Sequence, residues 1–137
     1  MGAGYSSTPQ ARKLGLKTGY RVRIDQPPAG WALDQPPDLL LVQETEPADV
    51  VVSFFRTATE LEARLPALAA GIYPQGALWV AWPRRAGGHV SDISENIVRD
   101  QALPLGIVDV KVAALDNDWS ALRFVWRVEN RPSSGRR

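Results

Sequence analysis

A strand, a helix and a second strand follow one another in the middle of this chain. The run from Asp49 to Phe55 is largely apolar, an amphipathic stretch covers Thr57 to Ile72, and Gly76 to Trp82 is apolar throughout. This order is the βαβ unit of a parallel sheet that carries helices on its faces. At 137 residues the chain is long enough for one such domain with its own core. The sequence therefore predicts a single three-layer α/β domain, Rossmann-like, with a mostly parallel sheet.

The central helix has two alternative starts, because Thr57 with Glu60, or Thr59 with Glu62, forms a capping box. Its apolar residues recur every three to four positions, which predicts one buried face. These residues are Leu61, Leu65, Leu68 and Ile72. A further helix is expected to begin near Ser91 or Asp92.

Strands are also expected on the N-terminal side. Tyr20 to Asp25 alternates apolar and charged residues, and Leu39 to Val42 is typical of a buried strand. Between them, the proline pairs in Gln26 to Asp38 exclude a long helix. The short link from Leu39–Val42 to Val50–Phe55 leaves two alternatives: antiparallel pairing, or a connection that crosses the sheet edge without a helix.

In the C-terminal third of the chain, apolar and charged residues alternate over two consecutive segments. Val108, Val110 and Val112 alternate with charged residues, and after the turn at Asn117 the residues Leu122, Phe124 and Trp126 do the same. This predicts an antiparallel hairpin with one core face and one charged face. We expect a flexible N-terminus over 1–7, the domain over 8–130 and a disordered tail over 131–137.

Composition excludes several classes of function. No cysteine is present, so thiol catalysis, disulfides and zinc–cysteine sites are excluded. A net charge of +1 argues against nucleic acid as a partner. No apolar run approaches the roughly 20 residues of a membrane helix. We expect a cytoplasmic protein without a metal, whose partner is a small molecule or a protein and whose oligomeric state is open.

The mostly parallel sheet that ends in an antiparallel hairpin resembles class I S-adenosylmethionine methyltransferases, in which the last strand lies antiparallel between its neighbours. The resemblance extends from Asp49 to Arg127, and Pro74 to Val80 resembles the turn and strand after the fourth helix of that family. It implies a Rossmann-like fold and S-adenosylmethionine as a possible cofactor.

The chain also resembles a family of short bacterial proteins of unknown function, and this resemblance covers nearly its whole length. The shared motifs are Gly4–Ser6, Lys13–Gly15, Leu78–Pro83, Leu105–Val112 and Trp119–Phe124. The resemblance implies no activity.

A cofactor-binding methyltransferase needs a glycine-rich turn after its first strand, so that the backbone can approach the cofactor. Here that turn, Asp25 to Gly30, has one glycine, and Pro27 and Pro28 remove two backbone donors. Glu44 lies roughly where an acid would hold the ribose hydroxyls, but an isolated surface residue explains it as well. We therefore expect no bound cofactor.

The loops after parallel strands gather at the C-terminal edge of a sheet, where ligands bind. Three such loops are predicted: Asp25 to Trp31, Ser53 to Thr57, and Trp82 to His89. We expect the largest polar-lined pocket to touch at least two of them. The candidate ligand-binding residues, none of them assigned as catalytic, are Asp25, Trp31, Ser53, Arg56, Trp82, Arg84, Arg85 and His89.

Within this set, Arg84 and Arg85 suit a phosphate or carboxylate. Trp31 and Trp82 either line a shared pocket or pack their loops onto the sheet.

The leading hypothesis is a degenerate methyltransferase-like domain that acts as a non-catalytic module binding a small ligand or a protein. The alternative is an active S-adenosylmethionine-dependent methyltransferase with an atypical cofactor loop. It predicts a deep pocket between Asp25, Ser53 and Trp82. A third hypothesis, nucleic-acid binding through Arg84, Arg85 and the arginine-rich tail, conflicts with the near-neutral charge.

Overall fold

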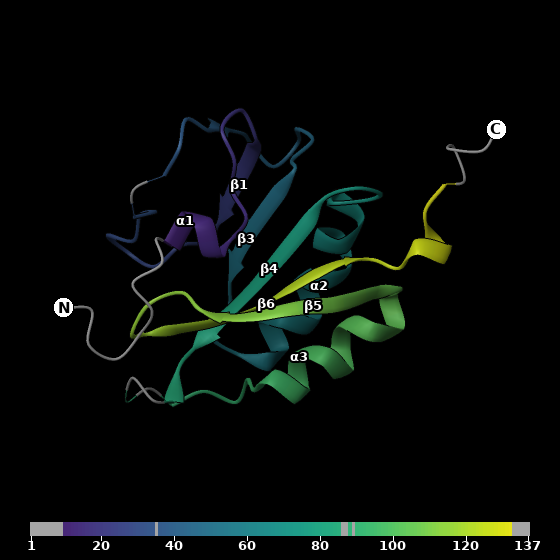
Figure 1. Cartoon of the computed structure of the whole chain (residues 1–137). Coiled ribbons are helices and arrows are strands. Elements are labelled where there is room, and N and C mark those ends of the chain that lie inside the picture. Colours follow the sequence, from purple (N-terminus) through teal and green to yellow (C-terminus); the bar gives the residue numbers. More distant parts are fainter. Residues whose placement is uncertain (1–9, 35, 86–87, 89, 133–137) are drawn as a thin grey trace.

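The structure, a computed structural model, describes residues 10–34, 36–85, 88 and 90–132. One six-stranded sheet runs through these residues in the order β2-β1-β3-β4-β6-β5 (Figure 1). The first four strands are parallel, and β6 is antiparallel to both β4 and β5. The predicted Rossmann-like α/β fold with an antiparallel C-terminal hairpin is confirmed. The flexible N-terminus predicted over 1–7 and all but two residues of the predicted tail lie outside the described residues.

The bounds of the elements follow the sequence pattern closely. The strands are β1 (Arg21–Asp25), β2 (Leu40–Leu41), β3 (Val50–Phe54), β4 (Ala77–Pro83), β5 (Ile107–Ala114) and β6 (Trp119–Trp126). The helices are α1 (Gln10–Lys13), α2 (Ala58–Gly71) and α3 (Glu95–Ala102), with short 3₁₀ helices η2 (Leu103–Leu105) and η3 (Val128–Asn130).

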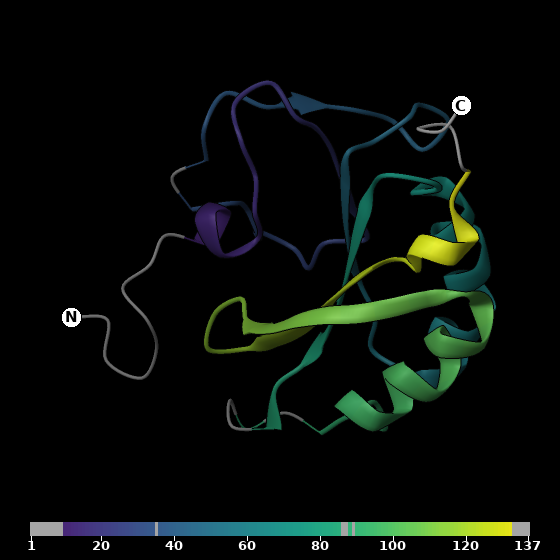
Figure 2. The same cartoon turned by 45° about the vertical axis from the view of Figure 1, so that its right-hand side comes forward.

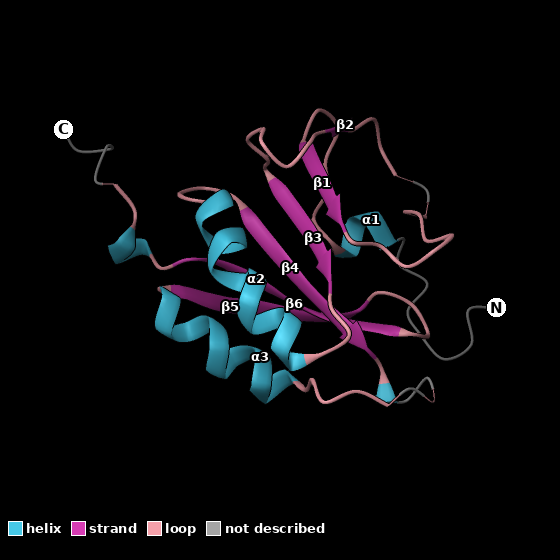
Figure 3. Cartoon of the chain, turned by 180° about the vertical axis from the view of Figure 1, so that it is seen from behind, coloured by secondary structure: helices cyan, strands magenta, loops and turns pink. Residues whose placement is uncertain are grey.

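Helices cover the two faces of the sheet unequally. α2 and α3 lie side by side on one face, seen from behind in Figure 3, and bury Leu61, Leu65 and Val98 against it. On the other face lie α1 and the proline-rich segment around 26–38, whose described residues 26–34 and 36–38 form no helix because proline disfavours one. Figure 2 shows the β5–β6 hairpin reaching toward α1, where Gln10 Nε2 donates a hydrogen bond to the Leu115 carbonyl at 2.8 Å.

Both long helices begin at a hydroxyl cap. Thr57 is the N-cap of α2 and its Oγ1 accepts from the Glu60 N–H at 3.2 Å, so the first of the two predicted starts is right. The predicted start of α3 near Ser91 or Asp92 is wrong by a few residues. Ser94 is its N-cap, because Ser91 instead donates to the Arg56 carbonyl and Asp92 accepts from the Ala58 N–H.

The strand at 39–42 differs from the prediction of a buried strand. β2 is the edge of the sheet, and Leu40 and Leu41 are 58% and 70% exposed. β1 lies between β2 and β3 and runs parallel to both. The antiparallel alternative is therefore wrong, and the short connection crosses the sheet edge without a helix.

The hairpin forms as predicted, but only some of the residues predicted for its core face are buried. Leu122 and Phe124 are buried, whereas Val110 and Val112 are 50% and 54% exposed. The reason is that β5 is the other edge strand and carries a register shift between Asp109 and Lys111.

Asp49 ties the start of β3 to β1. Its Oδ2 accepts from the Arg21 backbone N–H at 2.7 Å, and this hydrogen bond lowers the pKa of Asp49 below its ordinary value of 3.8. A lowered pKa in the folded state means that the charged carboxylate stabilises the fold above the unfolded pKa. This stabilisation is lost as the pH falls through the folded pKa.

We therefore expect Asp49→Asn to be less stable than the wild type at pH 7, by about 1 kcal/mol or less because the pair is largely exposed. The difference should shrink below pH 3.8. Urea unfolding at pH 7 and pH 3 measures it, with the exposed Asp100→Asn as the control. A difference that stays the same at both pH values would contradict the assignment to the charged carboxylate.

Candidate functional site

The strands β1, β3 and β4 end at one edge of the sheet, called here the C-terminal rim. Asp25 lies opposite Ser53 in the register of β1 and β3, and Phe54 lies opposite Ala81 of β4. The three predicted loops therefore start at neighbouring positions, as expected from parallel strands.

Asp25 and Ser53 form a polar cluster with a residue of α2. Ser53 is fully buried and its Oγ donates to Asp25 Oδ2 at 2.5 Å. Arg64 Nη2 lies 2.7 Å from the same carboxylate oxygen, and Arg64 Nη1 lies 3.5 Å from Ser53 Oγ. The carboxylate at the end of β1 is thus already paired within the protein.

The turn after β1 is held down on the turn after β3. Gln26 has φ of 54°, in the left-handed region that favours glycine. Its amide donates to the Phe54 carbonyl at 3.3 Å and to Glu60 Oε2 at 3.1 Å. Further along this loop, the Trp31 ring meets the Phe54 ring edge-on at 4.8 Å between centroids, and Trp31 Nε1 donates to Asp116 at 3.3 Å. Both ends of this loop are therefore held in place by contacts with the rest of the protein.

Trp31 and Trp82 do not share a pocket, so that alternative is wrong. Trp82 belongs to the core beneath α2 and α3, whereas Trp31 packs on the core of the opposite face. Packing of the loop onto the sheet, the other alternative, is what Trp31 does. Trp79 is fully buried on the same face, as its position inside β4 predicts.

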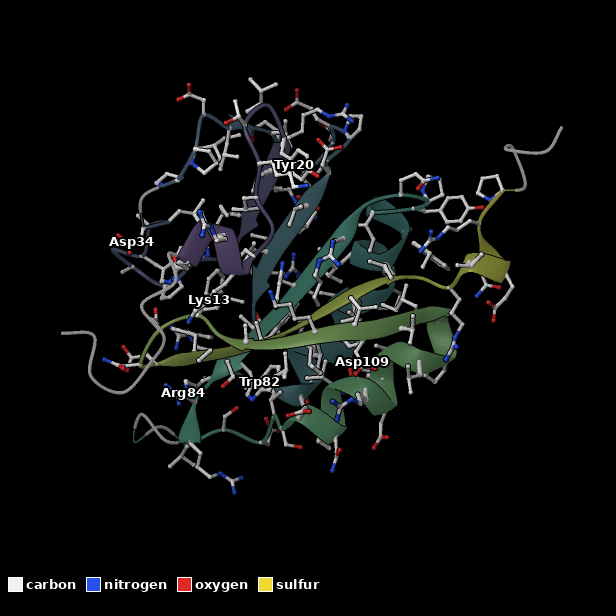
Figure 4. The ribbon with its side chains drawn as sticks, in the orientation of Figure 1. Lys13, Tyr20, Asp34, Trp82, Arg84 and Asp109 are labelled. Carbon is white, nitrogen blue, oxygen red and sulfur yellow. The ribbon has the colours of Figure 1, made fainter. Side chains whose placement is uncertain are left out.

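A polar hollow of about 350 Å³ lies at the end of β4, called here the rim hollow. Figure 4 labels Trp82 and Arg84 at this end of the strand. The residues that line it are Trp82, Pro83, Arg84, Arg85, Ser91, Ile93, Ser94, Glu95 and Ser120. Since Ser94 is the N-cap of α3 and Glu95 its first residue, the start of this helix is part of the lining.

The charges at the rim hollow favour an anion. Arg84 Nη1 donates to the backbone carbonyl of Asp116 at 3.1 Å, so this contact leaves its positive charge uncompensated. Arg85 is exposed. Glu95 is the acid that lines the hollow, but its carboxylate is bonded to Arg99. Hydrogen bonds to Asp109 and Glu95 raise the pKa of Arg99.

The remaining candidate residues are scattered. Arg56 lies over the Trp119 ring at 5.2 Å, and His89 lies outside the described residues. The prediction that the largest polar-lined pocket joins two loops is wrong. The rim hollow touches only the third loop, and a second polar hollow, lined by Gly30, Trp31 and Asp34, touches only the first. The loops are close together, but side-chain packing fills the space between them.

Sequence reasoning missed Arg64, Ser91 and Ser94. Arg64 directly precedes the buried Leu65, at the border of the apolar face of α2, from where a long side chain reaches the sheet. The position of Arg64 beside the apolar face was the sequence signal that could have identified it.

Among the described residues, no group of three or more His, Asp or Glu side chains is placed to hold a metal ion. No helix in the same part of the chain is long and apolar enough to cross a membrane.

No protein-family model matches the chain, and no curated protein matches it. The resemblance to the short bacterial proteins therefore rests on its motifs alone. Solved structures are similar instead. An O-methyltransferase of neocarzinostatin biosynthesis, solved with S-adenosylmethionine and 2-hydroxy-5-methyl naphthoic acid, is 13% identical with a TM-score of 0.52 over 92% of this chain and 52% of that chain.

Two further solved structures are similar to this chain. Fibrillarin of Aeropyrum pernix, with natively bound S-adenosyl-L-methionine, is 13% identical with a TM-score of 0.52 over 85% of this chain and 73% of that chain. A protein of the NADB-Rossmann superfamily from Streptococcus agalactiae is 11% identical with a TM-score of 0.51 over 92% of this chain and 70% of that chain. At such identity the similarity shows the fold alone. The protein thus has the Rossmann-like fold of class I methyltransferases, and it spans about half the length of several of them.

Proposed function

We propose that this domain is a non-catalytic binding module of methyltransferase-like fold. The closed turn after β1 carries the proposal. Asp25 is paired with Ser53 and Arg64, Gln26 is bonded to the neighbouring turn, and Pro27 offers no N–H. A cofactor of the size of S-adenosylmethionine would need these groups free. The residues present at this turn therefore do not fit the cofactor.

The rim hollow is the proposed ligand site. Its two arginines and the hydroxyl of Ser94 are donors suited to a phosphate or a carboxylate, and the start of α3 adds its positive dipole end. Trp82 and Ile93 add an apolar wall for the body of the molecule. A small organic molecule with an anionic group matches this lining better than a protein surface does, because the hollow is only about 350 Å³.

Isothermal titration with S-adenosylmethionine tests the loss of cofactor binding. We expect no saturable heat at micromolar concentrations, because the turn after β1 is already satisfied by internal contacts. Fibrillarin of Aeropyrum pernix, which natively binds this molecule, is the positive control. Binding at one micromolar site would instead support the active methyltransferase with an atypical loop.

Native mass spectrometry of the purified protein tests the rim hollow and gives the subunit number. We expect a carried-over small molecule whose binding weakens about ten-fold or more in Arg84→Gln and Arg85→Gln, since each removes a charged hydrogen-bond donor. Arg12→Gln, at an exposed position of α1, is the matched control and should retain the ligand. A ligand equally retained by all three variants would refute the assignment to this hollow.

A further inference from the structure

A second hollow lies away from the rim, between β1 and α2, and is called here the edge hollow. Its volume is about 260 Å³. Figure 3 shows α2 lying over the middle of the sheet, with β1 and β2 beyond it. The residues that line the edge hollow are Arg23, Glu44, Ala63, Arg64, Ala67, Leu68 and Gly71. It shares no lining residue with the rim hollow.

Arg23 lines this hollow and carries a buried donor that has no partner. Its Nη1 donates to the Glu44 carbonyl at 3.0 Å, which ties the guanidinium from the middle of β1 to the segment after β2. Its Nε has no access to solvent and no hydrogen-bond partner among the described residues. Buried N–H groups are almost always paired in folded proteins, so such a donor calls for an acceptor.

Arg64 supplies a second cation from the opposite wall. One of its nitrogens is held by Asp25 at 2.7 Å, and its guanidinium lies 5.5 Å from the centre of the Phe55 ring. Both arginines are therefore positioned by the protein before any ligand arrives. The small residues Ala63, Ala67 and Gly71 leave the wall formed by α2 open between them.

We propose that the edge hollow binds a small oxyanion, a phosphate or a carboxylate, with Arg23 as its main donor. A guanidinium presents its Nε and one terminal nitrogen as a fork that matches two oxygens of such an anion. Bidentate binding would give the Arg23 Nε its acceptor once the side chain turns this buried atom toward the hollow. Two carboxylates act against the anion: Asp25, already shared by Ser53 and Arg64, and the exposed Glu44.

Thermal unfolding with inorganic phosphate, at ionic strength held constant with sodium chloride, tests the proposal. The protein carries Arg84→Gln and Arg85→Gln, so that the rim hollow has lost its two charged donors. We expect a saturable rise in Tm, because a ligand that binds only the folded state stabilises it. Adding Arg23→Gln should weaken the apparent affinity about ten-fold or more, and adding Arg12→Gln should leave it unchanged.

Glu44→Gln sharpens the test, because removing an opposing charge should tighten phosphate binding a few-fold. Malonate in place of phosphate distinguishes the two anions: a lower dissociation constant for malonate assigns a carboxylate, and the reverse assigns a phosphate. Neither result concerns the rim hollow or S-adenosylmethionine, so this proposal stands or falls independently of the proposed function.

Nitrogen-15 NMR of the protein with Arg23 intact covers the case in which Arg23→Gln does not fold. The Arg23 Nε–H resonance should shift with phosphate and saturate at the same concentration as the Tm. No saturable change in either measurement, or an equal response of the Arg23→Gln and Arg12→Gln proteins, would overturn the proposal.

Discussion

Trp79→Ala is expected to lower the free energy of unfolding by about 3–5 kcal/mol, the usual cost of truncating a buried aromatic residue. Trp79 is 0% exposed in the middle of β4, and its Nε1 donates to the Leu14 carbonyl at 3.0 Å. The substitution therefore leaves a cavity beneath α1 and removes the hydrogen bond that holds the end of α1 to the sheet. A domain of this size is commonly stable by only about 5–15 kcal/mol, so the loss is a large fraction.

Urea unfolding followed by circular dichroism measures this loss, and the Tm should fall by roughly 10–20 °C. Trp79→Phe separates the two contributions, because it keeps most of the ring but not the hydrogen bond. Leu41→Ala is the control, since Leu41 is 70% exposed on β2 and should change stability by about 0.5 kcal/mol or less. A Trp79→Ala loss no larger than that of Leu41→Ala would mean that Trp79 is not in the core.

Asp25→Ala is expected to cost about 2–4 kcal/mol. The carboxylate is the acceptor for Ser53, which is fully buried, and the ion-pair partner of Arg64. Its removal leaves a buried hydroxyl and a half-buried guanidinium without their partner. The expected loss is large because unpaired buried polar groups cost more than the pair contributes.

A double-mutant cycle of Asp25→Ala and Arg64→Ala measures the coupling between the two side chains. We expect the double variant to be more stable than the sum of the two single losses predicts, because it no longer leaves a lone charge. Strict additivity would show that the two residues act independently. The cycle also bears on the proposed function: if Asp25 were a cofactor-binding residue, S-adenosylmethionine would protect the wild type and not Asp25→Ala.

The fold was predictable because its signals are local. The continuous apolar run Gly76–Trp82, the alternation in Leu122–Trp126 and the cap at Thr57 depend only on neighbouring residues. Proline likewise fixes its own backbone, so the absence of a long helix among the described residues of 26–38 was predictable. The position of the three loops at one rim followed from the direction of parallel strands.

Burial at the sheet edges was not predictable from these signals. Leu40 and Leu41 are as apolar as the residues of β3, yet they are exposed because β2 is the outermost strand. Val112 is exposed for the same reason at the other edge. Strand order depends on contacts between residues far apart in the chain, which periodicity does not encode.

Some residues of the candidate sites were likewise predictable from the sequence, and others were not. Arg84 and Arg85 were predicted at the end of β4 because the strand itself points to them, and they do line a hollow. The sequence alone determined the elements, their faces and the end of the sheet at which polar loops gather. Only the tertiary structure decided that Asp25 is paired with Arg64 and that Arg23 and Arg64 line the same hollow. A hollow is the space that packed side chains leave between them. Because this packing brings together residues that are distant in the sequence, the sequence pattern alone does not predict it.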